Sequence, residues 1–311
     1  MNLSSPTLAE LSQRDPTGRV DLESPRAVEG AIRAILDGMP GGCPDPGLLT
    51  RAIDDLVRAF RGDYPGLLRC DTLYHDLRHA LETGLTMARL LAGEASMSGP
   101  EAEPRIDRTH ALFGIILALY HDIGLLRRSH EADLWGASLT PVHEERGVEF
   151  LQNYLSGTSL AALAHKAELI MPTKLIFRIP AEWPALHQKL ASMIATADLL
   201  SQMADRCYLE KCRDFLFLEF SAIGLAGTDD SPYPDRETLL QKTPGFYSGF
   251  IAKRLDEDFG NVRRFMNHHF DGASPYDDAI QRNLDHLGNV LATHDYALLR
   301  RHPKVFVPML A

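Results

Sequence analysis

The sequence predicts an all-α fold, a compact array of many helices. Apolar residues recur at the 3.6-residue period of a helix along most of the 311 residues. No segment of convincing length alternates apolar and polar residues as a half-buried strand would. Prolines that follow Thr140, Met171 and Ile179 separate the helical segments, because the residue before a proline avoids the α conformation.

Residues 1–66 are predicted to form an N-terminal helical cap or arm. The first 25 or so residues are polar, and amphipathic helical spacing is present over 27–36 and 48–61. Gly-Met-Pro-Gly-Gly at 38–42 breaks the chain between these two helices. These residues carry no chemical signal, so we expect them to cover the rest of the protein.

Residues 67–205 are predicted to be the core of the protein, and residues 206–311 a helical part that packs on it and walls a pocket. In the core, helical spacing covers 76–92, 111–120, 144–155, 159–170 and 185–203. It continues over 208–223, 243–266 and 275–299.

Composition places the chain among soluble globular proteins, with 45% hydrophobic and 24% charged residues. The net charge of −10 and the absence of a basic stripe argue against binding to nucleic acid or to an anionic membrane. Four cysteines without C-x-x-C spacing indicate free thiols in a reducing compartment. No signal peptide is visible, and the longest apolar run is too short to cross a bilayer, so we expect a cytoplasmic protein.

His121 and Asp122 stand side by side at the end of the apolar run 111–120 (ALFGIILALY). A histidine beside a carboxylate at the end of a buried helix is costly unless something binds them. A divalent metal ion would do so, because both groups are good ligands for such ions. A surface pair in a turn is the alternative, so the pair becomes informative only if other ligands fall nearby.

Other His and Asp residues do fall where they could share that ion. His75 and His79 are four residues apart, about 40° of rotation on a helix, so their rings would leave the same face. His143 lies at the start of a predicted helix, and His165 lies inside the apolar run LAALAHKAELI. Asp198 lies inside an apolar helix. It could be a metal ligand, or it could cap a helix or form a hydrogen bond in the core.

This series of His and Asp residues is similar to that of the HD superfamily of metal-dependent phosphohydrolases. Over residues 70–255 or so, the chain resembles the catalytic domain of class I cyclic-nucleotide phosphodiesterases. The matching motifs are Tyr74–Ala80 (YHDLRHA, for Y-H-N-x-x-H-A), the apolar helix ending in His121-Asp122, His143–Leu151 (HEERGVEFL, for H-x-x-x-G-x-x-x-L) and Ala197-Asp198-Leu199 with Glu219-Phe220 downstream. The resemblance implies the HD-domain, phosphodiesterase-like helical array.

The resemblance also implies two divalent metal ions, which could be Mn, Mg, Zn or Fe. The first ion would be held by His79, His121, Asp122 and Asp198, and Asp122 would bridge to the second. In some branches His143 and His165 complete the shell of the second ion. In the phosphodiesterase branch that ion is mostly bound by water molecules, and these two histidines would contact the water ligands and not the ion itself. One ion remains an alternative to two.

The implied reaction is hydrolysis of a cyclic-nucleotide-like phosphodiester or of a nucleotide phosphate ester. A hydroxide that bridges the two metals would attack phosphorus, so Asp122 is a catalytic residue as the bridging ligand. His75 matches the family's general acid, which protonates the leaving alkoxide. Asp76 or another carboxylate could hold the tautomer of His75.

Three further residues are candidates for binding the substrate. Lys174 could form an ion pair with the phosphate of the substrate; alternatively, it is an exposed residue on a solvated face. Tyr247 and Phe250 lie in the stretch 243–254, which matches the wall of the family's nucleotide pocket. Both could stack on a base, and packing in the core is the alternative.

The chain departs from the phosphodiesterase pattern at three places. Asp76 stands where that family has Asn, and Tyr247 stands where it has the Gln that grips the purine. Ile123-Gly124 after the His-Asp pair is closer to the HD-I-G of the bacterial cyclic-dinucleotide branch, although the G-Y-P signature is missing. Selectivity for cAMP or cGMP is therefore not implied.

Two other functions remain open at this point. Mixed-valent di-iron oxygenases of the HD superfamily use the same ligand set, because such ligands suit Fe as well as Mn, Mg or Zn. A catalytically degenerate HD module that binds a nucleotide is the other. The expected partner is a small-molecule phosphate ester or nucleotide, not nucleic acid or a membrane, and the sequence leaves a homodimer open.

Overall fold

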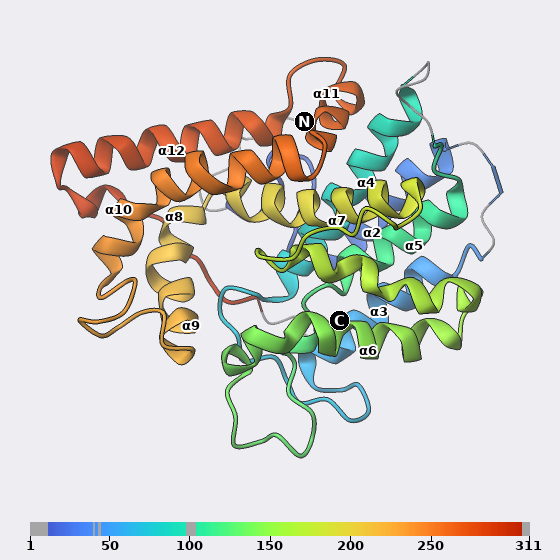
Figure 1. The fold of residues 1–311 in the computed structure, drawn as a ribbon, viewed down its shortest axis with the longest axis horizontal. Helices are drawn as coiled ribbons and strands as arrows, with labels where there is room; N and C mark the ends of the chain where they lie inside the picture. The colour runs from blue at the N-terminus through green and yellow to red at the C-terminus, as the bar shows by residue number, and fades with distance from the viewer. Residues whose placement is uncertain (1–11, 40, 43–44, 98–103, 307–311) are drawn as a thin grey trace, which may run out of the picture.

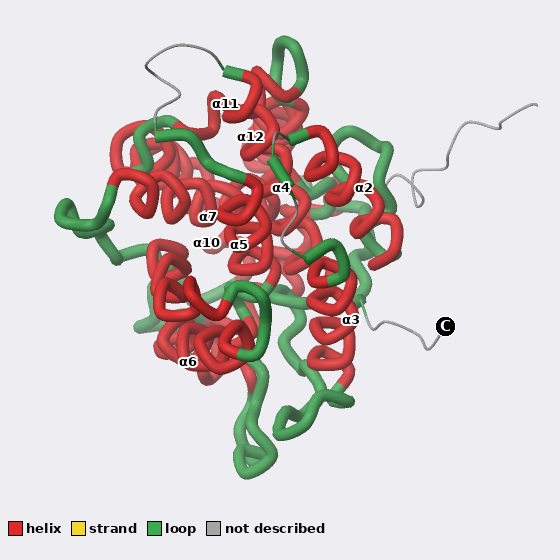
Figure 2. The backbone as a smooth tube through the Cα atoms, turned by 90° about the vertical axis from the view of Figure 1, so that its right-hand side faces the viewer, coloured by secondary structure: helices red, strands yellow, loops and turns green. Residues whose placement is uncertain are grey.

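The all-α prediction is confirmed by a computed structural model, which describes residues 12–39, 41–42, 45–97 and 104–306. Within these residues the regular elements are helices, and extended pairing is limited to isolated bridges (Figures 1 and 2). The α-helices are α2 (Pro25–Gly38), α3 (Leu48–Arg61), α4 (Leu77–Ser96), α5 (Arg108–Leu119), α6 (His143–Ser156), α7 (Ala185–Ala204), α8 (Tyr208–Lys211), α9 (Phe217–Ala222), α10 (Arg236–Phe246), α11 (Phe265–His269) and α12 (Pro275–Thr293).

Short 3-10 and π-helical segments, labelled η, connect or extend these helices. The 3-10 segments are η2 (Ile123–Leu125), η3 (Gly136–Val142), η4 (Ala161–Thr173), η8 (Val262–Arg264) and η9 (Tyr296–Leu298). The π segments are η5 (Cys212–Leu216), η6 (Tyr247–Ile251) and η7 (Arg254–Asp258).

Three neighbouring helices, α4, α5 and α7, form the centre of the molecule (Figure 1). Every residue is buried over 77–91 of α4, 111–119 of α5 and 190–201 of α7. Helices that are apolar on all sides are stable only inside a core, which accounts for α5 and the middle of α7. Helix α4 is buried with them although it also carries charged side chains such as Arg78 and Glu82. The polar residues that they carry inward are therefore held by rigid, well-packed elements.

The hydrophobic core draws on residues from Leu22 to Leu299, so all three predicted segments of the chain contribute to it. The boundaries at 66 and 205 stay a prediction. Part of the predicted N-terminal arm, residues 1–11, lies outside the described residues. None of the described helices combines the length and apolar character that a membrane span requires.

Glycines allow the elements around the His-Asp pair to approach each other closely. A Cβ added at Gly124 of η2 would lie 1.9 Å from the carbonyl oxygen of His143 and 2.8 Å from the nitrogen of Gly147. The backbone of η2 thus lies directly against the first turn of α6 because no side chain separates them. This contact sets the distance between Asp122 and His143.

The helix predicted over 76–92 begins at Leu77 and runs to Ser96. Its start is fixed by Asp76, whose side chain accepts a hydrogen bond from the backbone N–H of His79 (3.0 Å) as an N-cap. His75 precedes the cap, so the prediction that His75 and His79 share a helical face is wrong.

Three other predicted helices differ in the structure. The helix predicted over 275–299 ends at Thr293, because the next residue, His294, has a left-handed φ of 51°. The segment predicted over 159–170 is the 3-10 helix η4, which contains Pro172. The segment predicted over 243–266 is interrupted at Asn261, whose φ of 52° is left-handed. Asparagine adopts that conformation more readily than most residues, so it allows the chain to turn there.

Candidate metal centre

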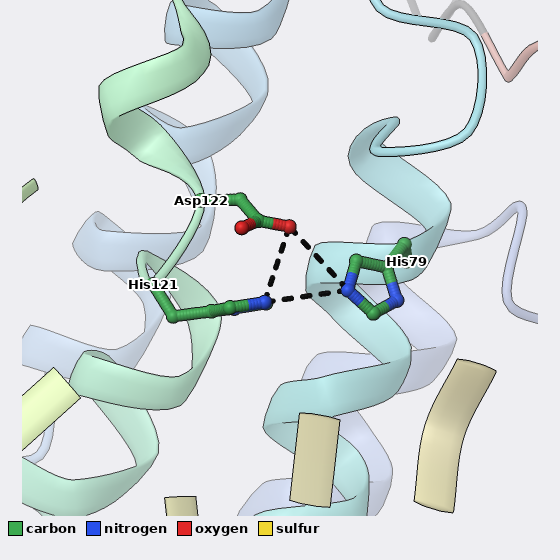
Figure 3. A group of neighbouring side chains, drawn as sticks. All are labelled: His79, His121 and Asp122. Atoms are coloured by element: carbon green, nitrogen blue, oxygen red, sulfur yellow. Dashed lines mark hydrogen bonds and ion pairs between the residues drawn. The ribbon is translucent and has the colours of Figure 1, made fainter. Parts of the chain in front are cut away.

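His79, His121 and Asp122 form a buried group that could hold a metal ion. Their side chains point toward one another from the first turn of α4 and from the end of α5 (Figure 3). The Nε2 atoms of His79 and His121 are 3.3 Å apart. Oδ2 of Asp122 lies 3.4 Å from Nε2 of His79 and 3.1 Å from Nε2 of His121.

Asp198 of α7 joins the two histidines of this group. Its Oδ1 lies 3.2 Å from Nε2 of His79 and 3.5 Å from Nε2 of His121. The same oxygen accepts a hydrogen bond of 2.7 Å from the side-chain amide of Gln202, one turn further along α7. Each of the three central helices therefore contributes to the group directly or at its end.

His143, the first residue of α6, approaches Asp122 on its other oxygen. Nε2 of His143 lies 3.3 Å from Oδ1 of Asp122, whereas His79 and His121 face Oδ2. One oxygen of this carboxylate thus faces the imidazoles of His79 and His121, and the other faces the imidazole of His143. This is the arrangement that a carboxylate shared by two ions requires.

The outer nitrogens of two of these histidines are bonded to backbone carbonyls. Nδ1 of His121 is 2.9 Å from the carbonyl oxygen of Ala118, and Nδ1 of His143 is 2.7 Å from that of Thr140. A carbonyl oxygen can only accept, so each Nδ1 carries the proton and donates it. In a neutral imidazole Nε2 is then left as a lone pair aimed at the group, as histidine ligands of metals require.

The electrostatics of the group favour a bound cation. Burial lowers the pKa of His79, but the carboxylates of Asp122 and Asp198 outweigh it and raise that pKa to about 9. The same two carboxylates raise the pKa of His121 well above its usual value against the effect of burial. Oδ2 of Asp122 is buried without a hydrogen-bond partner. Protons or a metal ion would satisfy the buried lone pairs, so the donor set fits a divalent ion.

His75 lies beside this group and is held by Glu219 of α9. Nδ1 of His75 is 2.6 Å from Oε2 of Glu219, whose Oε1 accepts the backbone N–H groups of Leu73 (2.7 Å) and Tyr74 (2.6 Å). Burial lowers the pKa of His75, but the charges of Glu219 and Asp122 outweigh it and raise the pKa. The carboxylate that orients His75 is thus Glu219, because Asp76 is engaged as the cap of α4.

The structure does not bring His165 to the metal centre, so its assignment as a ligand is corrected. His165 is exposed on η4, whereas Ala164 and Ala167 are buried. In a 3-10 helix residues i and i+3 share a face, so Ala164, Ala167 and Ile170 point to the core together. His165, one position off that face, points to solvent. The apolar run suggested a buried histidine because we assumed the α-helical period.

Lys174 lies near His143 but is already paired. Its Nζ is 2.6 Å from Oε1 of Glu145, 3.0 Å from the carbonyl oxygen of Pro141 and 3.7 Å from Oε2 of Glu144. A phosphate contact would have to compete with these partners.

Tyr247 and Phe250 are half-buried on η6 and pack against the core. The ring of Phe250 stacks on that of Phe246, with centroids 5.4 Å apart. Among the described residues, no hydrogen bond or ring contact connects them with the metal centre. Their role in substrate binding stays a prediction.

Two residues that support the centre could not be assigned from the motifs. Gln202 lies four residues after Asp198, a spacing that places both on one helix face and could have been noticed. Arg146 donates to the carbonyl oxygens of Gly124 (2.8 Å) and Leu126 (3.2 Å) and pairs with both oxygens of Glu131 (2.8 Å each). No local sequence pattern predicts these contacts, because the partners of Arg146 lie 15 to 22 residues before it, beyond the reach of helical spacing.

Comparison with known proteins gives one partial match. A family model described as Npun_R2479-like matches residues 129–265, which is less than half of the chain. The matched region contains His143, Asp198 and Glu219 but not His79, His121 or Asp122. No curated protein and no solved structure matches the chain. The comparisons therefore give no link to the HD superfamily, and the resemblance to it is one of motifs alone.

Proposed function

We propose that this protein is a metal-dependent phosphohydrolase that cleaves a phosphodiester, such as a cyclic nucleotide, or a nucleotide phosphate ester. The observation that carries the proposal is the position of Asp122. One of its oxygens faces His79 and His121, and the other faces His143. A carboxylate placed in this way can be shared by two divalent ions, as in two-metal phosphatases and nucleases.

In this proposal His79, His121, Asp122 and Asp198 hold one ion, and Asp122 and His143 contribute to a second. Bound divalent ions would supply Lewis acidity, which activates water and neutralises the charge of the phosphate. The backbone carbonyls of Ala118 and Thr140 fix the two imidazoles that they contact. Because helices and not loops carry most of these ligands, their geometry is set before the substrate arrives.

His75 is the proposed proton donor to the leaving alkoxide. Its ring centroid is 5.9 Å from that of His79, so it lies beside the metal centre, and 20% of its side chain remains exposed. Glu219 accepts a hydrogen bond from Nδ1–H, which leaves Nε2 of the protonated ring to carry a second proton toward the substrate. Despite burial, the charges of Glu219 and Asp122 raise the pKa of His75, which favours the protonated ring that a general acid requires.

The central test combines metal analysis with hydrolysis assays on the purified protein. We expect one or two divalent ions per chain and turnover of bis(p-nitrophenyl) phosphate or of a cyclic nucleotide. Asp122→Ala should lose both while the helical circular dichroism spectrum is retained. A metal-free wild-type protein would refute the proposal. Iron with substrate-dependent O₂ uptake and no hydrolysis would instead establish an oxygenase.

His143 and His165 offer a matched pair of substitutions. His143→Ala removes a side chain 3.3 Å from Asp122 and should lower metal content and the hydrolysis rate by about tenfold or more. His165→Ala removes an exposed side chain and should change neither by more than about twofold. Equal losses in the two variants would mean that η4 lies against the centre, contrary to the structure.

A further inference from the structure

A second cavity, of about 670 Å³, lies outside the candidate metal centre and is lined by basic side chains. Its walls come from the start of α4, the turn after α7, the middle of α12 and the segment 298–304. The basic residues that line it are Arg78, Arg206, Arg282, Arg300, Arg301 and Lys304, whereas Glu23 and Glu210 are the acidic ones. Such a concentration of positive charge is unexpected in a chain whose net charge is −10.

Several of these cations have no acidic partner among the described residues. Within the described part of the chain, the side chains of Arg206, Arg282 and Arg301 form no ion pair, and Nε of Arg206 is buried without a hydrogen-bond partner. Burial and the nearby charges of Arg282 and Arg301 lower the pKa of Arg206. Like charges held together without compensation destabilise a fold, and proteins retain such arrangements mainly at functional sites.

Arg78 forms the inner wall and is the most buried of these cations. It is 4% exposed, its Nη2 is 3.4 Å from Oδ1 of Asp205, and its Nε lacks a hydrogen-bond partner. Asp205 is shared, because Nζ of Lys211 lies 2.6 Å from its Oδ2. One carboxylate thus faces two buried cations, which leaves Arg78 with donors to spare toward the cavity.

We propose that this cavity binds a small polyanion, a polyphosphate group that carries three or more negative charges. Guanidinium groups match phosphate oxygens in geometry as well as in charge. No Phe, Tyr or Trp is among the described residues that line the cavity, so the large aromatic rings on which bases usually stack are missing from this lining. The cations converge on one hollow and do not form an extended stripe, which favours a small anion over a nucleic-acid backbone.

The cavity is separate from the proposed reaction centre. None of His79, His121, Asp122, His143 and Asp198 lines it. Arg78 and His79 are nevertheless consecutive residues of α4, so an anion bound to Arg78 would lie against the same helical turn that presents His79. Anion binding here does not depend on the proposed function, because it takes place at a different site.

The test is a titration of the intact protein with inorganic tripolyphosphate, monitored by calorimetry and by thermal melting. We expect one binding site in the wild-type protein, with affinity that falls as salt rises. Arg282→Gln/Arg301→Gln should weaken binding at least tenfold. Without ligand, this double variant should melt at the same temperature as the wild type or higher, because it relieves repulsion. Both residues are exposed, so the substitutions should not disturb folding.

Two controls distinguish binding in this cavity from binding elsewhere on the protein. Lys253→Gln/Arg264→Gln removes two positive charges outside the cavity and should keep the wild-type affinity within about twofold. Asp122→Ala removes the metal centre and should still bind tripolyphosphate. Loss of binding in Asp122→Ala but not in Arg282→Gln/Arg301→Gln would place the anion at the metal centre and overturn the proposal. Binding of a single-stranded oligonucleotide but not of tripolyphosphate would overturn it as well.

Discussion

The contact between η2 and α6 can be tested with a single methyl group at Gly124. In Gly124→Ala the new Cβ would lie 1.9 Å from the carbonyl oxygen of His143, and Cβ atoms essentially never come within 3.0 Å of such an atom. The backbone at His143 must therefore recede by about 1 Å, since a densely packed core offers no free space. The obstacle is backbone and not a flexible side chain, so no rotamer change can remove it.

The displacement should lower both the stability and the metal affinity of the protein. Overpacking of this kind costs about 1–3 kcal/mol, which urea denaturation would detect as a lower midpoint with an unchanged slope. Metal sites tolerate errors of only about 0.2 Å in ligand distance. A shift of about 1 Å between Asp122 and His143 should therefore lower metal affinity by about tenfold or more, measured by competition with a chelator.

Gly288→Ala is the matched control. Gly288 lies inside α12 with no atom within 4 Å of the added Cβ, and neither Gly124 nor Gly288 has a positive φ. The control should therefore stabilise the protein by about 0.5–1 kcal/mol, because alanine is the better helix former. If Gly124→Ala kept wild-type stability and metal affinity, η2 and α6 could not lie as close as the structure has them, and the reasoning would fail.

Three more predictions concern charges and metal. Glu219→Gln should lower the hydrolysis rate by about 10–100-fold while metal content stays the same, because the neutral amide no longer raises the pKa of His75. The loss should be larger for poor leaving groups than for p-nitrophenolate. Arg146→Met should lower the free energy of unfolding by about 1–2 kcal/mol at neutral pH. The hydrogen bonds from Arg146, with that from the backbone of Arg128, lower the pKa of Glu131 to about 2. The difference between variant and wild type should therefore shrink as the pH falls from about 5 toward 2, where Glu131 becomes protonated. Chelation should lower the melting temperature, because metal present at about 100 times its Kd stabilises the folded state by about 2.7 kcal/mol; a melting temperature that does not depend on metal would contradict this.

The helices and the centre of the site were predicted from local patterns. The continuous apolar runs of α5 and α7 predict burial on every side, and a buried helix that ends in His121-Asp122 must bring those groups inside with it. Asp198 could be identified for the same reason. The grouping of these residues with His79 came from the resemblance of motifs, since residues so far apart in sequence leave no local sign of contact.

Tertiary structure decided the features that depend on where a segment turns. His75 lies before α4 because Asp76 caps the helix, and it is held by Glu219, which is 144 residues away. His165 points outward because η4 has three residues per turn, a period that packing and not composition selects. The basic cavity gathers side chains from both ends of the chain, so no window of sequence displays it.

There is a physical reason why some features could be predicted from the sequence and others could not. Hydrophobic periodicity and capping act over a few residues, so the sequence by itself determined the fold class, most of the helices and the buried His-Asp pair of this protein. Distances between side chains on different helices depend on how their surfaces pack, and only the folded chain fixes them. Those distances decided which residues share the candidate metal centre and that, among the described residues, Arg206, Arg282 and Arg301 form no ion pair.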